Sequence, residues 1–188
     1  MFERFTRDAR AVVRGAVEHA ERTGARSVDA GHLLLALLDR DAGRAASALA
    51  ALGLDGRREE VRRALDETRR HAGLSRADTD ALAGLGIDVP DLVARVERDH
   101  GVGALSGDRG GEGGRGAGRR GLDRDAKDTL EKALRLAVAR RDGHIGDEHI
   151  LLALSIRPGV PGEVLADHGV THASLMRVLH GDGQAQAG

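Results

Sequence analysis

The sequence predicts an all-α fold, and three observations support this class. The apolar residues are mostly Ala, Leu and Val, with Phe2 and Phe5 as the only aromatic residues; this composition suits closely packed helices better than a sheet of β-branched and aromatic side chains. Apolar positions recur at spacings of three and four, as on one face of a helix. The N-terminal part of the chain is also repeated in its C-terminal part, which predicts two related helical units.

The repeat is clearest in two segments, GHLLLAL around His32 and EHILLAL around His149, whose histidines lie 117 residues apart. Upstream, the same offset superimposes the alanines of one apolar stripe. Downstream, after the loss of one residue, LAALGL (49–54) aligns with LADHGV (165–170), and Gly53 and Gly169 are each expected in the left-handed conformation that closes a helix. We therefore predict an internal duplication.

Each unit is expected to contain four helices. In the first, Thr6 is a good N-cap for a helix over 7–22, and the short helix after Asp29 is apolar around most of its circumference, so it should be buried. A third helix is expected to end at Leu52 and a fourth to span about 56–70.

The second unit repeats this pattern from Asp123, with later helices from about Pro161 and Thr171. Between the units, a short helix should end near Gly84 and another should begin at Asp88. The expected organisation is a first unit (1–70), a helical insertion (71–105), a flexible Gly- and Arg-rich linker (106–121), a second unit (122–180) and a disordered tail (181–188).

Composition narrows the function. Lys and Arg together number 29 against 30 for Asp and Glu, so no overall basic field is present to attract nucleic acid or an anionic membrane. Cysteine is absent, which excludes disulfides and cysteine metal sites. The N-terminus lacks the apolar stretch of a signal peptide, and no run reaches about 18 apolar residues. We expect a cytoplasmic protein without a membrane partner.

The segments MFERFTRDARAVVRGA, GHLLLAL, ALGL and DEHILLAL resemble the double Clp repeat, the N-terminal domain of ClpC- and ClpA-type unfoldases, over residues 1–70 and 121–180. The resemblance implies one bundle of two pseudo-symmetric four-helix Clp repeats. In that family the domain docks adaptors and substrates onto a ring ATPase. No G-x-x-x-x-G-K-[ST] segment occurs here, so the phosphate cradle for ATP is missing and the chain resembles a free-standing Clp N-domain.

The resemblance also implies two candidate sites. In ClpC-type domains the Glu of each Thr-Glu-His segment binds the guanidinium of phosphoarginine; Glu148 matches the second of these, whereas Gly31 stands at the first. Asp147 replaces the preceding Thr and would repel a phosphate at a helix start. The alternative interpretation of Asp147 and Glu148 is plain capping of a helix.

The second candidate site is a groove near the N-terminus, where family members bind cyclic-peptide antibiotics and partner proteins. The residues that match it are Phe2, Arg10, Lys127 and Glu131, whereas Leu122 replaces a Phe and offers less flat contact area. Ordinary packing against the first helix is the alternative for Phe2.

Catalytic and metal sites are not expected. His32 and His149 are followed by apolar runs, which favours buried, hydrogen-bonded core histidines over a metal pair. His168 and His172 have zinc-like spacing, but Gly169 breaks the helix between them. Neither a G-x-S-x-G motif nor a cysteine nucleophile is present, so we expect neither an enzyme nor a cofactor.

Three functional hypotheses follow. The leading one is a non-enzymatic interaction module of the Clp proteolysis system that binds substrates, adaptors or the unfoldase itself, as adaptor or competitor. The second is a protein that sequesters cyclic peptides. The third is a nucleic-acid-binding regulator that uses the linker 106–121, although this segment lacks aromatic residues for base stacking.

Overall fold

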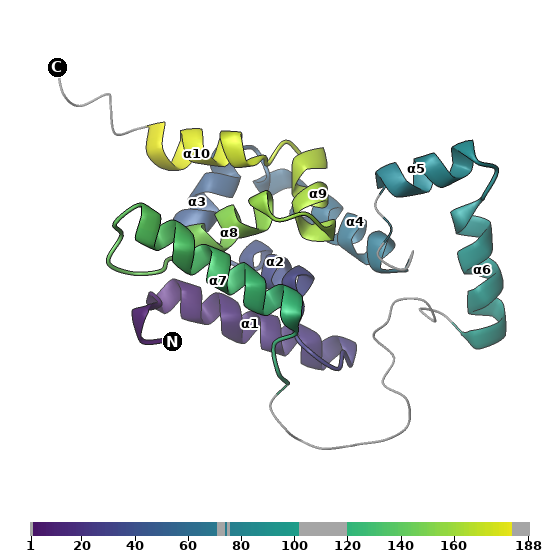
Figure 1. Cartoon of the computed structure of the whole chain (residues 1–188), viewed down its shortest axis with the longest axis horizontal. Helices are drawn as coiled ribbons and strands as arrows, with labels where there is room; N and C mark the ends of the chain where they lie inside the picture. Colours follow the sequence, from purple (N-terminus) through teal and green to yellow (C-terminus); the bar gives the residue numbers. More distant parts are fainter. Residues whose placement is uncertain (1, 71–73, 75, 102–119, 182–188) are drawn as a thin grey trace.

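The computed structural model describes residues 2–70, 74, 76–101 and 120–181 of the chain (Figure 1). Within these residues it contains ten α-helices and two short 3₁₀ turns, η1 (Phe2–Arg4) and η2 (Asp55–Arg57), so the predicted all-α class is confirmed. In chain order the helices are α1 (Arg7–Thr23), α2 (Ala30–Leu38), α3 (Arg44–Ala51), α4 (Arg58–Arg70), α5 (Arg76–Gly84), α6 (Val89–His100), α7 (Arg124–Ala139), α8 (Asp147–Ile156), α9 (Val160–Asp167) and α10 (His172–His180).

Helix ends lie where the local sequence places them. Thr6 and Asp123 are the N-caps of α1 and α7, and each side chain accepts the backbone N–H three residues later, at 3.1 and 2.7 Å. Such caps satisfy one of the backbone donors that a helix start leaves free. Gly53 and Gly169 have φ of 76° and 81°, the left-handed conformation expected of them. Equivalent positions of the duplication therefore perform the same local task.

The helices α2 and α8 form the centre of the molecule (Figure 1). All nine residues of α2 and the first eight of α8 are buried. α1 packs against α2, α7 packs against α8, and α2 contacts α8 between them. The prediction that these apolar helices are buried is confirmed.

Two short parallel bridges connect the units in a reciprocal way. Phe5 pairs with Ile145, and Val28 pairs with Leu122. Two backbone hydrogen bonds of 2.8 to 2.9 Å hold each bridge. Phe5 and Leu122 are equivalent in the duplication, as are Val28 and Ile145. The segment that enters the first helix of each unit therefore pairs with the loop before the second helix of the other unit.

The third helices also cross between the units. α3 packs against α8 and α10 of the second unit, and its equivalent, α9, packs against α2 and α4 of the first. The buried apolar residues of both units belong to one continuous core. The two units consequently share a single interior.

The predicted insertion contains α5 and α6, which pack against each other; α5 lies on the side of α4 and α9, and α6 lies farther out (Figure 1). Nearly all of the predicted linker (106–121) and tail (181–188) lies outside the described residues, so the segment boundaries remain predictions. In the part of the chain that the structure describes, no helix has both the length and the apolar character needed to cross a bilayer.

Candidate functional site

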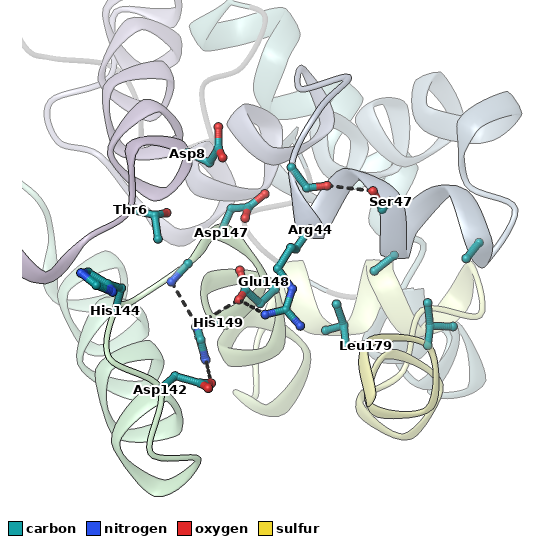
Figure 2. Close-up of a pocket in the computed structure, with 15 residues that line it drawn as sticks. Thr6, Asp8, Arg44, Ser47, Asp142, His144, Asp147, Glu148, His149 and Leu179 are labelled. Carbon is teal, nitrogen blue, oxygen red and sulfur yellow. Dashed lines mark hydrogen bonds and ion pairs between the residues drawn. The ribbon is translucent and has the colours of Figure 1, made fainter. Parts of the chain in front are cut away.

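A pocket of about 710 Å³ lies between α3, α8 and α10, where the two units meet (Figure 2). It contains both residues of the predicted phosphoarginine-type site. Polar side chains occupy the part near the start of α8, and apolar side chains of α3 and α10 occupy the opposite part. Its lining consists of Thr6, Asp8, Gly43, Arg44, Ser47, Ala48, Ala51, Asp142, His144, Gly146, Asp147, Glu148, His149, Val178 and Leu179.

His149 closes the start of α8. Its side chain is buried, Nδ1 accepts the backbone N–H of Gly146 at 3.0 Å, and Nε2 lies 2.9 Å from a carboxylate oxygen of Asp142 (Figure 2). Because Nδ1 accepts a hydrogen, the neutral ring carries its proton on Nε2 and donates it to Asp142. Both nitrogens are therefore engaged. His32 is also buried and accepts the backbone N–H of Asp29 at the start of α2, so the predicted core role of both histidines is confirmed.

Asp147 caps a helix of the other unit. Its Oδ2 accepts the backbone N–H of Ala45, in the first turn of α3, at 3.1 Å. Burial raises the pKa of Asp147, and the charges of Glu148 and Asp8 raise it further, whereas the N–H of Ala45 opposes the rise. The capping interpretation therefore holds for Asp147, but the helix that it caps is α3 and not α8, where it lies.

Glu148 is bound to an arginine of the first unit. Its Oε1 lies 3.0 Å from Nη1 of Arg44, and the Glu148 side chain is 6% exposed whereas that of Arg44 is 58% exposed. Gly146 makes this arrangement possible, because a Cβ there would overlap Oε2 of Glu148. Gly43, with φ of 118°, likewise leaves room for the carboxylate of Asp147. Glu148 thus already holds a guanidinium, and that group belongs to this chain.

The start of α2, which is equivalent to the start of α8, holds a different ion pair. Asp29 is the N-cap of α2, accepts the N–H of His32 at 2.8 Å and lies 2.8 Å from Nη2 of Arg69 on α4. Burial alone would raise the pKa of Asp29, but hydrogen bonds from His32 and the charge of Arg69 outweigh it and lower the pKa to about 2. Gly31 stands beside this pair, and a Cβ there would lie 2.8 Å from Nη2 of Arg69.

Sequence reasoning missed Arg44 and Ala45, the partners of Glu148 and Asp147. A signal for them does exist in the duplication. When the third helices are aligned, Val160 and Pro161 stand at these positions. The first unit has Ala30 and Gly31 in place of Asp147 and Glu148. On α9, Val160 replaces the arginine, and Pro161 has no N–H that a carboxylate could cap. The paired exchange indicates a contact.

The residues of the predicted groove lie apart from this pocket. Arg10 and Lys127 occupy equivalent exposed positions on α1 and α7, and Glu131 is exposed and 3.3 Å from Arg135. Leu122 is half-buried against the core. The side chain of Phe2 lies outside what the structure describes. None of the four groove residues whose side chains are described lines the large pocket or a smaller one of about 370 Å³ between α4 and α9, so the groove remains a prediction.

Histidine and carboxylate groups elsewhere have local roles. Nδ1 of His168 lies 2.9 Å from the carbonyl oxygen of Val164, within the same helix end. Among the described residues, no group of three or more His, Cys, Asp or Glu side chains has the arrangement of a metal site.

Comparison with known proteins identifies one family. A search of curated proteins gives no significant match. Residues 4–84 match the family model described as the Clp repeat (R) N-terminal domain. This range covers α1 to α5, and α7 to α10 repeat the order and contacts of α1 to α4. The match covers less than half of the chain and, together with the all-α fold, is consistent with the predicted Clp repeat N-terminal domain.

Proposed function

We propose that this chain is a non-enzymatic binding module of the Clp ATP-dependent proteolysis system, which binds substrates, adaptors or the unfoldase itself, as adaptor or competitor. The observation that carries the proposal is the Clp repeat match over residues 4–84. A Clp repeat domain is in general a protein-interaction module of this system.

The pocket chemistry supports binding over catalysis. General acid–base catalysis needs a titratable group within reach of the substrate proton. Here Asp147 is held by the N–H of Ala45, Glu148 by Arg44, and both ring nitrogens of His149 by neighbours. These three groups are held in structural contacts, so none of the three is left as a free base; His144, which also lines the pocket, is exposed.

The composition of the pocket supports a peptide ligand. Its volume of about 710 Å³ is within the range of pockets that enclose small ligands. Ala48, Ala51 and Leu179 offer apolar contact, and Arg44 and Ser47 offer polar groups at the exposed rim. A short segment with one apolar and one polar side chain matches this division.

We propose further that binding does not depend on phosphoarginine. The carboxylate of Asp147 lies beside Glu148, where a phosphate would need neutral or positive donors. Arg44 already satisfies the carboxylate that the family resemblance assigns to the ligand guanidinium. An unphosphorylated partner segment fits the site with less electrostatic conflict.

A second candidate function is sequestration of cyclic peptides. The exposed positions of Arg10, Lys127 and Glu131 on α1 and α7 support it. This hypothesis predicts ligand binding at these residues without contact to a Clp unfoldase. The nucleic-acid hypothesis depends on residues 106–121, of which the structure describes only the last two.

The decisive experiment is affinity capture with the purified protein from a lysate of its source organism, read by quantitative mass spectrometry. Ala51→Tyr places a bulky ring at the pocket, and Ala50→Tyr is the matched control, because Ala50 is an exposed neighbour on α3 that does not line the pocket. We expect Clp unfoldase, peptidase or substrates with the unmodified protein and the control, and about tenfold less with Ala51→Tyr.

Two outcomes would contradict the proposal. If no Clp component is enriched with any of the proteins, a role in the Clp system is refuted. If a cyclic peptide instead binds and Lys127→Ala abolishes its binding, the sequestration hypothesis replaces it. Equal capture by Ala51→Tyr and Ala50→Tyr would move the binding site away from the pocket.

A further inference from the structure

The turn between α5 and α6 presents exposed apolar side chains. Leu85, Ile87 and Leu92 are 78%, 44% and 47% exposed, and they are three of the five large apolar residues exposed in the described part of the chain. The other two, Val138 and Ile156, lie singly on the body of the molecule. Scattered apolar residues need no explanation, but a group within eight positions indicates a binding surface.

This turn has a defined backbone conformation. Gly86 has φ of 81°, its N–H donates to Ala83, and the N–H of Ile87 donates to Leu82, which is the hydrogen-bond pattern of a Schellman motif. Asp88 then caps α6 through the N–H of Asp91 at 2.9 Å. The C-terminal motif of α5 is thus followed directly by the N-cap of α6. A surface that is already ordered loses little conformational entropy on binding.

Negative charge predominates around the turn. Residues 77–94 contain four aspartates and no Lys, Arg or His, and Arg95, just beyond this range, lies 3.6 Å from Asp91. Asp80 and Asp88 are exposed and lie within five residues of Leu85 or Ile87 in the sequence. Val138 and Ile156, in contrast, lie close in sequence to Arg140 and Arg157. The turn therefore combines an apolar centre with an acidic rim, and its complement is an apolar segment flanked by basic residues.

We propose that the α5–α6 turn is a docking surface for a basic amphipathic segment of a partner protein. It lies beyond α4 and α9, on the side of the molecule away from α1 and α7 (Figure 1), so it is separate from the pocket between α3, α8 and α10. The inference does not rest on the proposed Clp role, because it follows from the exposure, order and charge of this turn alone. Recognition of an amphipathic helix by an apolar surface with opposite rim charge is a common binding mode.

The test uses the full chain and a synthetic helical peptide with leucines on one face and lysines on the other. Binding is followed by fluorescence anisotropy and located by amide chemical shifts in NMR spectra. We expect shifts in α5 and α6, a dissociation constant that rises steeply with salt, and at least about tenfold weaker binding after Leu85→Ser, Ile87→Ser and Leu92→Ser together. The matched control is Val138→Ser with Ile156→Ser, which should leave affinity unchanged.

A second variant keeps the apolar residues and removes charge, so that a folding defect in the first does not decide the result. Asp80→Asn with Asp88→Asn, in which the asparagine can still cap α6, should weaken binding several-fold and reduce its salt dependence. The proposal is overturned if a peptide with glutamates in place of lysines binds equally well, if the control loses affinity as the triple variant does, or if the shifts lie at the pocket between α3, α8 and α10.

Discussion

The starts of α2 and α8 are equivalent in the duplication, yet they hold their charges differently. Both use a histidine ring to accept the first backbone N–H. At α2 the carboxylate is the N-cap, Asp29, and its arginine comes from α4 of the same unit. At α8 the N-cap is Gly146, the carboxylate is Glu148, and its arginine comes from α3 of the other unit. The ion pair at the start of α2 lies within one unit, whereas the ion pair at the start of α8 joins the two units.

This difference teaches that duplicated units diverge by coupled exchanges. Asp147 of the second unit and the N–H of Ala45 in the first form a contact between the units. The equivalent positions, Ala30 and Pro161, lack both the acceptor and the donor. A buried carboxylate without its donor would be costly. Acceptor and donor are therefore either both present or both absent, so neither interface between the units leaves a buried carboxylate without its donor.

The largest expected effect comes from the shared histidines. His32→Ala and His149→Ala each remove a buried ring and leave a backbone N–H without its acceptor, which should lower the free energy of unfolding by about 2–4 kcal/mol. Urea denaturation followed by circular dichroism measures this. Losses below about 1 kcal/mol in both variants would mean that the rings do not hold the helix starts.

Next in size is the cap that crosses between the units. Asp147→Ala should cost about 1–2 kcal/mol in unfolding free energy, because α3 loses its N-terminal acceptor. Asp147→Asn keeps an acceptor oxygen and removes repulsion from Glu148 and Asp8, so it should lose much less. The same denaturation experiment compares the two. Equal losses would show that charge, and not capping, is what Asp147 contributes.

Asp29 at the start of α2 and Asp147 at the start of α8 should change the pH dependence of stability in opposite directions. The folded pKa of Asp29, about 2, lies below its unfolded value, so its ionisation stabilises the fold above about pH 4 and this contribution is lost as the pH falls toward 2. After allowance for partial exposure, Asp29→Asn should cost about 1–2 kcal/mol at neutral pH and almost nothing near pH 2.

For Asp147 the folded pKa is raised, so ionisation of this carboxyl destabilises the fold as the pH rises. The free energy of unfolding of Asp147→Asn should therefore increase relative to that of the unmodified protein as the pH rises through that pKa. Unfolding curves between pH 2 and 7 report both variants. Parallel curves for the two substitutions would contradict the assignment of opposite signs.

The smallest effects should come from the two arginines. Arg69 is 15% exposed and Arg44 is 58% exposed. Solvent therefore screens the charge of Arg44 beside Glu148 more strongly than that of Arg69 beside Asp29. Removal of Arg44, however, leaves the buried carboxylate of Glu148 without its partner, which offsets that screening. We expect Arg69→Met and Arg44→Met each to cost about 1 kcal/mol in unfolding free energy, and Arg44→Met to cost less when Glu148→Gln is also present. An unchanged loss in the double variant would show that Arg44 does not act through Glu148.

Sequence reasoning succeeded where the determinants are local. Caps such as Thr6 and Asp123, the closing residues Gly53 and Gly169, and the burial of α2 and α8 all follow from spacing within one segment. The partners of Asp147 and Glu148 lie about a hundred residues away, on a helix whose contacts depend on how the units pack. Helical periodicity carries no information about that packing, and therefore Arg44 and Ala45 were missed.

The reciprocal bridges have a consequence for folding. Phe5 and Ile145, like Val28 and Leu122, are far apart along the chain, so the native topology has many non-local contacts, and closing it is slower than folding a bundle of neighbouring helices. Neither half can complete its interior by itself. A fragment that ends before α7 would leave the backbone groups of Phe5 and Val28 unpaired. Because Val28 is equivalent to Ile145, we expect such a fragment to associate with a second copy through these groups.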